Sequence, residues 1–303
     1  MISILIPEYN YDCSTLVGKL AGQCQNAGIS FEILVMDDAS SMFLEENREL
    51  SKLPGCQFIE SPLNLKAAKI RNRLGQMAKF PYLLFLDCDL EICDEGFIHR
   101  YLESLGKAAV LVGAVVYQKS KPPVSQRLRW KYGRNRECLP VDIRNRNPWK
   151  SLPSSNFLME KAVFDQVPFD EGFDQYGHED TLFGLTLKKK GISVLYIDNP
   201  LIHNGLESSE VFLAKSLIAV EKYGSMPVMQ SSEVVEQIRI FKFYQRITLL
   251  KLDGLLAFKY RILEKLMHRQ LCGSHPNLLI FDFYRLGYLC DFMRKRKHFC
   301  PEV

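Results

Sequence analysis

Short apolar runs alternate with amphipathic stretches along the first part of the chain. The apolar runs span residues 2–6, 31–36, 56–60 and 82–86. Between them, residues 14–25 and 65–79 have apolar side chains at helical spacing, with Ser14 as a helix cap. Strands that alternate with helices predict βαβ units, and therefore an α/β fold with a mainly parallel sheet flanked by helices.

The same pattern continues further along, and then the chain becomes helical. Further strands are predicted over residues 110–117, 154–159 and 194–197, with a helix over 182–190. Residues 234–269 predict one or two helices, with Gly254 as a break, and residues 281–292 are rich in aromatic side chains.

Polar clusters follow three of the predicted strands. They are Glu8 to Asn10, the pair Asp37-Asp38, and Asp87 with Asp89. Because ligands bind at the carboxyl ends of strands in parallel sheets, these clusters predict one shared site. The carboxylates of Asp87-Cys88-Asp89 are hard ligands that suit Mg²⁺ or Mn²⁺ and, through the metal, a diphosphate.

The motifs that bind phosphate through backbone amides are missing from the sequence. There is no GxGxxG dinucleotide fingerprint after the first strand and no GxxxxGK[ST] P-loop. A phosphate would therefore be held through a metal at Asp87 and Asp89, or by Lys69 or Arg71.

Composition narrows the protein class. The 303 residues are 47% hydrophobic and 24% charged, with a net charge of +4, which is ordinary for a soluble globular protein. Nine cysteines without a CxxC pair indicate reduced thiols. The first residues predict a strand and not a signal peptide, and no apolar stretch is long enough to span a membrane. We therefore expect a cytoplasmic protein.

Two further sites have both a structural and a functional interpretation. Glu179 and Asp180 begin a predicted helix, where carboxylates are favoured by the helix dipole, but either is also suited to act as a general base. A lone histidine is more often structural than a metal ligand, but His203 follows a strand end, as the Asp87 and Asp89 pair does, which strengthens the metal-binding interpretation.

The order and spacing of these motifs resemble family 2 glycosyltransferases, which are inverting enzymes of the GT-A fold. The resemblance covers residues 1–205, and its later part is similar to domains related to galactosyltransferases. The motifs that carry it are SILIPEYN at 3–10, VMDDAS at 35–40, Asn64 with Arg71 and Asn72, FLDCDLEI at 85–92, PFDEGFDQYGHEDTLFG at 168–184 and LIHN at 201–204.

The resemblance implies a GT-A catalytic domain over residues 1–205, a nucleotide-sugar donor such as a UDP-sugar, and Mn²⁺ or Mg²⁺. It implies that Asp180 is the catalytic base, that Glu179 positions a hydroxyl, and that Asp89 and His203 bind the metal. The residues assigned to the donor are Pro7, Glu8, Tyr9, Asp38, Arg71, Asp87 and Asn156. Glu8 departs from the family pattern, which has a small polar residue after the proline.

Two stretches of the sequence allow more than one interpretation. Residues 118–150 are rich in Lys and Arg with interleaved aromatic residues, which is typical of a solvated loop, of a loop that meets an anionic acceptor, or of a nucleic-acid contact. Residues 206–303 predict a helical extension. This extension is interpreted as a helical subdomain packed on the catalytic core, or as a basic amphipathic surface for the cytoplasmic face of a membrane, where lipid-linked acceptors lie, and the two interpretations are compatible.

Three activities are compatible with such a domain. The first is sugar transfer to a glycan or lipid-linked acceptor. The second is a nucleotidyltransferase, which should carry a glycine- and arginine-rich loop where this chain has Pro7-Glu8-Tyr9-Asn10. The third is a non-catalytic GT-A-like module that binds a glycan or a partner. Because Asp89 and Asp180 are both present, the sequence favours the first.

Overall fold

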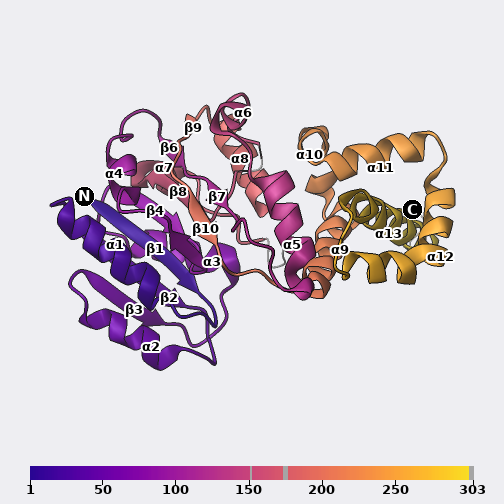
Figure 1. Ribbon diagram of the computed structural model, residues 1–303. Helices are drawn as coiled ribbons and strands as arrows, with labels where there is room; N and C mark the ends of the chain where they lie inside the picture. The colour runs from indigo at the N-terminus through magenta and orange to yellow at the C-terminus, as the bar shows by residue number, and fades with distance from the viewer. Residues whose placement is uncertain (151, 173–176, 300–303) are drawn as a thin grey trace. The chain divides into compact units, whose positions relative to one another are not determined.

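The computed structural model describes residues 1–150, 152–172 and 177–299 and divides the chain into two compact units (Figure 1). The first unit contains residues 1–118, 137–174 and 182–205, and the second contains residues 119–136, 175–181 and 206–303. The last border along the chain follows residue 205. Two short segments before it, residues 119–136 and 175–181, nevertheless group with the C-terminal helices.

A seven-stranded sheet forms the centre of the first unit. Its strands lie in the order β3-β2-β1-β4-β8-β6-β9, and β8 is the described strand that runs antiparallel to both neighbours. The strands are β1 (Ile2–Glu8), β2 (Phe31–Asp37), β3 (Cys56–Glu60), β4 (Tyr82–Leu86), β6 (Val110–Val112), β8 (Asn156–Glu160) and β9 (Val194–Tyr196). The predicted α/β class with a mainly parallel sheet is confirmed.

Helices cover both faces of this sheet, because successive strand residues point to opposite sides. Ile4 and Ile6 of β1 pack with one set of helices, and Leu5 packs with the other. On the first face lie α1 (Ser14–Asn26) and α4 (Phe97–Leu102), and on the second lie α3 (Lys66–Met77), α7 (Lys161–Gln166) and α8 (Glu179–Lys189). Shorter helices are α2 (Leu44–Arg48), the 3₁₀ turn Glu49–Lys52 and α6 (Val141–Asn145).

A small second sheet determines where His203 lies. It contains β5 (Leu90–Ile92), β10 (Leu201–His203) and β7 (Val115–Val116). Strand β10 is antiparallel to β5, and its register pairs His203 with Leu90, the residue that follows Asp89. The strand predicted over residues 110–117 is divided between the two sheets at Gly113, where a Cβ would overlap the side chain of Asn156.

The second unit is helical and has its own core. Its core residues include Leu128, Phe212, Tyr260 and Phe281, and the Phe212 and Phe281 rings stack with centroids 5.4 Å apart. Its helices are α5 (Arg127–Tyr132), a π-helical turn (Gly133–Glu137), α9 (Ser209–Ser225), α10 (Ser232–Gln237), α11 (Arg239–Leu249), α12 (Asp253–Leu271) and α13 (Leu278–Phe299), with 3₁₀ turns at Val124–Gln126 and Pro227–Gln230.

The break in the predicted helix over residues 234–269 occurs before Gly254. Helix α11 ends at Leu249 and α12 begins at Asp253, while a further break at Ile238 separates α10 from α11. In the part of the chain that the structure describes, no helix is both long enough and apolar enough to cross a bilayer.

The basic stretch 118–150 contributes to the second unit through several of its cations. Arg136 forms an ion pair with Asp282 at 2.8 Å, and Lys131 donates a hydrogen bond to the Pro276 carbonyl at 2.8 Å. The Arg134 guanidinium lies 4.9 Å from the centre of the Trp130 ring, within the range of a cation–π contact. These cations are therefore structural, and residues 119–136 are not a simple solvated loop.

Asn156 connects the two sheets of the first unit. Its side chain is fully buried, donates to the carbonyls of Ala114 and Asn199 at 3.1 and 3.0 Å, and accepts from the Tyr101 hydroxyl at 2.7 Å. All of its amide atoms are thus used inside the fold, which corrects the prediction that places Asn156 in the donor site.

We expect Asn156→Ala to lower the free energy of unfolding by about 3 kcal/mol, because the Asn199 carbonyl and the buried Tyr101 hydroxyl each lose a partner and the Ala114 carbonyl loses one of its two donors. Urea denaturation followed by circular dichroism measures this change. The matched control is Asn26→Ala, at an exposed position at the end of α1, which should leave the unfolding midpoint nearly unchanged. A loss below about 1 kcal/mol for Asn156→Ala would contradict the structural role.

Candidate active site

Two buried carboxylates meet at the ends of the first two strands. The register of β1 and β2 pairs Glu8 with Asp37. Glu8 is 1% exposed and accepts hydrogen bonds from the Tyr11 amide at 2.6 Å and the Ser40 hydroxyl at 3.3 Å. Burial, together with the neighbouring Asp37, raises the pKa of Glu8 to about 7. Glu8 therefore titrates near neutral pH.

Asp38 fixes the start of helix α3 beside this pair. Its carboxylate accepts hydrogen bonds from the backbone amides of Leu65 and Lys66, the latter at 3.1 Å. Burial raises the pKa of Asp38 despite these two donors. Two other predicted donor residues flank the cluster: Pro7 is half-buried within β1, and the Tyr9 ring is exposed after it. An exposed tyrosine here offers a face on which a nucleotide base can stack.

Asp87, the first residue after β4, forms an ion pair with Arg71. The Asp87 Oδ1 to Arg71 Nη2 distance is 2.6 Å, and Arg71 also donates to the Ala67 carbonyl at 3.3 Å. Arg71 is buried, and its guanidinium lies 5.9 Å from the centre of the Phe169 ring. The structure thus connects two residues that the sequence assigns separately to the donor site.

Asp89 lies against His203. Their Oδ2 and Nε2 atoms are 3.4 Å apart, and the Asn204 amide donates to the Asp89 carbonyl at 2.9 Å. The carboxylate occupies the space that a side chain at Gly205 would need, because a Cβ there would overlap it. The predicted metal-binding pair is therefore brought together by the β5 and β10 register.

This pair fits a divalent cation. The buried Nδ1 of His203 has no hydrogen-bond partner within the described residues, and the Tyr117 ring stacks on the imidazole with centroids 5.5 Å apart. A carboxylate oxygen beside an imidazole nitrogen is a donor set that Mn²⁺ and Mg²⁺ accept. Among the described residues, no third carboxylate, imidazole or thiolate joins this pair.

The middle residue of the Asp-Cys-Asp motif is anchored to helix α1. The Cys88 thiol lies within hydrogen-bonding reach of the buried Cys13 thiol, and this contact, together with burial, raises the pKa of Cys13. Cys88 also packs against the apolar cluster that contains Cys13. The Cys88 side chain therefore anchors the turn that carries Asp87 and Asp89.

Glu179 and Asp180 are the first two residues of α8, and they belong to the second unit. Glu179 Oε2 accepts a hydrogen bond from the Gly177 amide at 2.9 Å. Gly177 has a φ of 111°, and a Cβ there would overlap Ala219 of α9. This close approach holds the start of α8 against α9. Residues 173–176 of the EGFDQYGHED motif lie outside the described residues.

His178 supports the same segment from inside the second unit. Its ring meets Phe241 edge-on with centroids 5.1 Å apart. Burial, together with the charges of Arg285 and Lys222, lowers the pKa of His178 to about 4, so the imidazole is neutral at physiological pH. Because His178 is neutral, it places no positive charge near Asp180, which lies two residues further along the chain.

Sequence reasoning missed three contributors to the site. Gly205 makes room for Asp89, Tyr117 stacks on His203, and Cys13 contacts Cys88. Gly205 directly follows the LIHN motif, so its proximity to His203 was visible in the sequence. Nothing in the sequence indicates the contacts of Tyr117 and Cys13, because they depend on the packing of distant segments.

Comparison with known proteins identifies the family. The model of the family described as "Glycosyl transferase family 2" matches residues 3–171, which is more than half of the chain. The chain belongs to glycosyl transferase family 2. It is therefore a glycosyltransferase, and the predicted resemblance is confirmed. Glu179, Asp180 and His203 lie beyond the matched residues.

More distant similarities accompany this match. Chondroitin synthase of Escherichia coli is 24% identical over 224 residues, which cover 63% of this chain and 32% of that protein. The chain thus spans about a third of the length of that relative. Two crystal structures of TarS from S. aureus are similar with TM-scores of 0.48. One is 17% identical over 73% of this chain and 39% of TarS, and the other, of TarS residues 1–349, is 14% identical over 99% and 92%.

The raised pKa of Glu8 predicts a pH dependence of stability. Between about pH 4.5 and about 7 the native state binds a proton on Glu8 that the unfolded chain does not, so the free energy of unfolding falls as the pH rises through this window. Glu8→Gln should remove up to about 3 kcal/mol of that fall.

Urea denaturation at about pH 5 and about pH 8 measures the effect, with Glu95→Gln, at an exposed carboxylate, as the control. An equal pH dependence in Glu8→Gln and the unmodified protein would show that Glu8 titrates normally.

Proposed function

We propose that this protein is a metal-dependent inverting glycosyltransferase that moves a sugar from a nucleotide-sugar, a UDP-sugar in the first instance, to a hydroxyl of a glycan or lipid-linked acceptor. The observation that carries the proposal is the pair of Asp89 and His203, with Oδ2 and Nε2 3.4 Å apart at the end of the central strand β4. Family membership supplies the reaction class and the nucleotide-sugar donor.

The donor nucleotide is proposed to bind along the ends of β1, β2 and β4. Tyr9 provides an exposed ring for the base, and Asp38, at the end of β2, provides a carboxylate for a base or ribose group. Arg71 is held by Asp87, which fixes its guanidinium beside the position we assign to the diphosphate. Glu8 and Asp37 are buried side by side at the ends of β1 and β2, next to these residues in the sequence.

Transfer requires a base and a stabilised leaving group. Asp180 is the proposed general base: it accepts the proton of the acceptor hydroxyl as that oxygen attacks the anomeric carbon. The bond from the anomeric carbon to the diphosphate breaks on the opposite side, which inverts the configuration. A divalent cation bound by Asp89 and His203 would supply the positive charge that neutralises the leaving diphosphate. Glu179 is proposed to position a hydroxyl group.

The similarity to a chondroitin synthase supports a role in building a surface polysaccharide or glycoconjugate. A lipid-linked acceptor would bring the enzyme to the cytoplasmic face of the membrane. The C-terminal helices are the part of the chain that we expect to make that contact.

Asp89→Ala should abolish the metal dependence of nucleotide binding and lower transfer by about a thousandfold or more. Titration of UDP by calorimetry, with and without Mn²⁺, measures the first effect, and release of nucleotide from UDP-sugars measures the second. Asp165→Ala, at an exposed carboxylate of α7, is the control for folding and charge. Nucleotide binding by Asp89→Ala that still strengthens with Mn²⁺ would place the metal elsewhere.

Asp180→Asn should separate binding from chemistry. The amide keeps the shape of the side chain but does not accept a proton, so transfer should fall by about a hundredfold or more while affinity for UDP stays within about twofold. The matched control is Asp165→Asn. Wild-type turnover by Asp180→Asn would assign the base to another residue.

A screen of UDP- and GDP-sugars with Mn²⁺ or Mg²⁺, with and without saccharide acceptors, tests the proposed donor. Nucleotide release with a UDP-sugar supports it, whereas release with GDP-sugars alone would overturn it.

A further inference from the structure

Helix α12 has two apolar faces. Its inner face carries Ala257, Tyr260, Met267 and Leu271, all buried in the second unit. A helix at the surface of a globular unit normally has one such stripe and a polar face opposite it. Here the opposite face is apolar as well.

The outer face consists of Leu255, Phe258, Ile262 and Leu266, which we call the α12 ridge. These residues follow one another at intervals of three or four, so they form a continuous stripe on the helix. Their exposed fractions are 49%, 60%, 63% and 67%. Leu249 and Leu250, in the turn that precedes α12, are 82% and 67% exposed and extend the apolar surface. Exposed apolar surface of this extent marks an interaction site.

Positive charges border the ridge. Lys259, Lys265 and Arg269 are exposed on the same helix, and within the described residues none of them forms an ion pair. The wider region is strongly basic: residues 239–299 contain thirteen Lys and Arg against four Asp and Glu. An apolar stripe between cations is the pattern of a helix that lies in a membrane interface.

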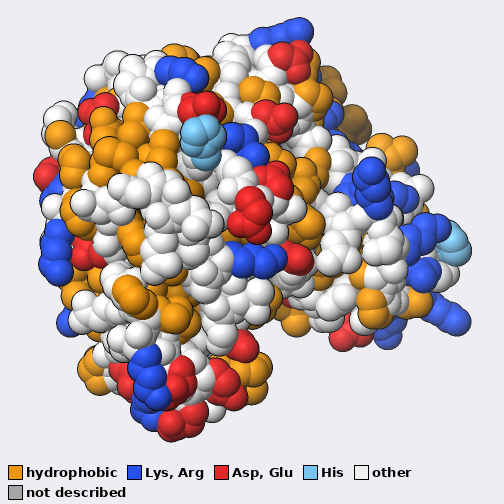
Figure 2. All heavy atoms as spheres, turned by 60° about the vertical axis from the view of Figure 1, so that its left-hand side comes forward, with side chains coloured by type: hydrophobic (Ala, Val, Ile, Leu, Met, Phe, Trp, Pro, Cys, Tyr) orange, Lys and Arg blue, Asp and Glu red, His pale blue; other side chains and the backbone are white. Residues whose placement is uncertain are grey.

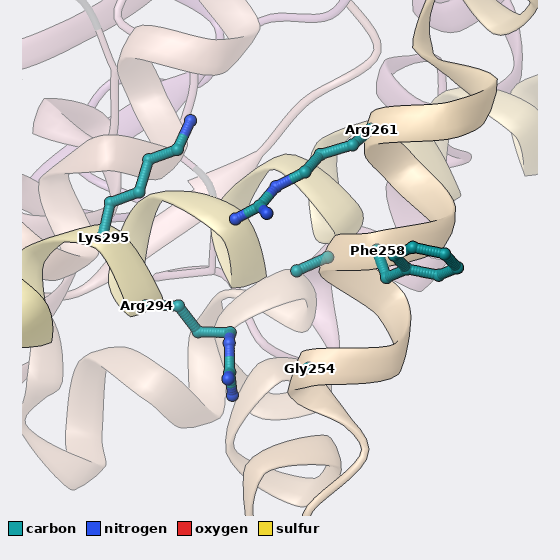
Figure 3. A pocket seen from close by; sticks show the side chains of 6 residues that line it. Gly254, Phe258, Arg261, Arg294 and Lys295 are labelled. Atoms are coloured by element: carbon teal, nitrogen blue, oxygen red, sulfur yellow. The ribbon is translucent and has the colours of Figure 1, made fainter.

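A pocket of about 210 Å³ lies between α12 and α13 at the edge of the ridge and is lined by Phe258, Arg261, Arg294 and Lys295. Figure 3 shows Arg261 reaching from α12 toward α13, whereas the Phe258 ring points the other way. Two carboxylates balance part of this charge: Asp291 pairs with Arg261 and Lys295 at 2.5 and 2.7 Å, and Asp253 pairs with Arg294 at 3.0 Å. Three cations facing two carboxylates leave a net positive pocket beside the apolar ridge.

We propose that the α12 ridge binds the surface of a membrane that contains anionic phospholipid. The apolar side chains would enter the boundary between headgroups and acyl chains, and Lys259, Lys265 and Arg269 would face the lipid phosphates. Charge complementarity favours an anionic membrane over a second copy of the chain. Two copies joined along the ridge would bring their cations together. The inference rests on the helix itself, so it holds or fails independently of the transfer reaction.

Co-sedimentation of the full chain with vesicles tests the proposal. The chain should bind vesicles of phosphatidylcholine mixed with phosphatidylglycerol, bind vesicles of phosphatidylcholine alone much more weakly, and lose affinity as salt is raised. The double variant Ile262→Ser with Leu266→Ser should weaken binding about tenfold or more, because exposed apolar side chains are removed without disturbing the buried face.

The matched control is Leu63→Ser, since Leu63 is 70% exposed in the first unit, and it should bind like the unmodified chain. Lys259→Gln should weaken binding about fivefold, whereas Lys107→Gln, at an exposed position of the first unit, should not. Circular dichroism confirms that each variant is folded.

Three results would overturn the proposal. The first is the absence of binding to both kinds of vesicle. The second is equal vesicle binding by the ridge variant and the unmodified chain. The third is a dimer in analytical ultracentrifugation that the ridge variant converts to a monomer, which would assign the face to self-association. Nucleotide release measured with a soluble acceptor should be the same for the ridge variant and the unmodified chain. A failure of the membrane proposal is therefore distinguishable from a failure of the proposed transfer reaction.

Discussion

Strand β4 is apolar on both faces, and this constraint determines where the chemistry lies. Leu83 and Phe85 pack on one side of the sheet, and Leu84 and Leu86 pack on the other. A carboxylate within such a strand would be buried without water, at a cost of several kcal/mol. Charged groups therefore come only after Leu86, where Asp87 forms an ion pair with Arg71. Strands β1 and β2 differ, because their last residues, Glu8 and Asp37, are themselves buried carboxylates that the register places side by side.

Local patterns in the sequence predicted the layers of the first unit well. The bounds of β3 and β4 agree with the predicted runs, because a short apolar segment between polar ones has few alternatives in a βαβ context. The prediction of a single strand over residues 110–117 agrees less well with the structure, which has two short strands there. The segment is divided between two sheets at Gly113, which lies against the Asn156 side chain. That contact joins residues more than forty positions apart in the sequence.

The site required contacts of still longer range. Asp89 and His203 were both predicted as metal ligands, but their 3.4 Å approach depends on the pairing of β5 with β10. Asn156 was predicted in the donor site, and only the fold shows that the partners of its amide are internal. On the face shown in Figure 2, acidic and basic side chains are interspersed, so surface charge alone does not mark the site.

The small net charge of the whole chain conceals a division that has physical consequences. Residues 239–299 carry an excess of nine positive charges, so the rest of the chain, with 26 Lys and Arg against 31 Asp and Glu, carries an excess of five negative charges. Close to an anionic surface, within a Debye length of about 8 Å, the basic helices are attracted and the acidic remainder is repelled. Attraction of one part and repulsion of another favour contact through the basic helices that carry the proposed α12 ridge. Such a preference follows from charge alone, before any acceptor is bound.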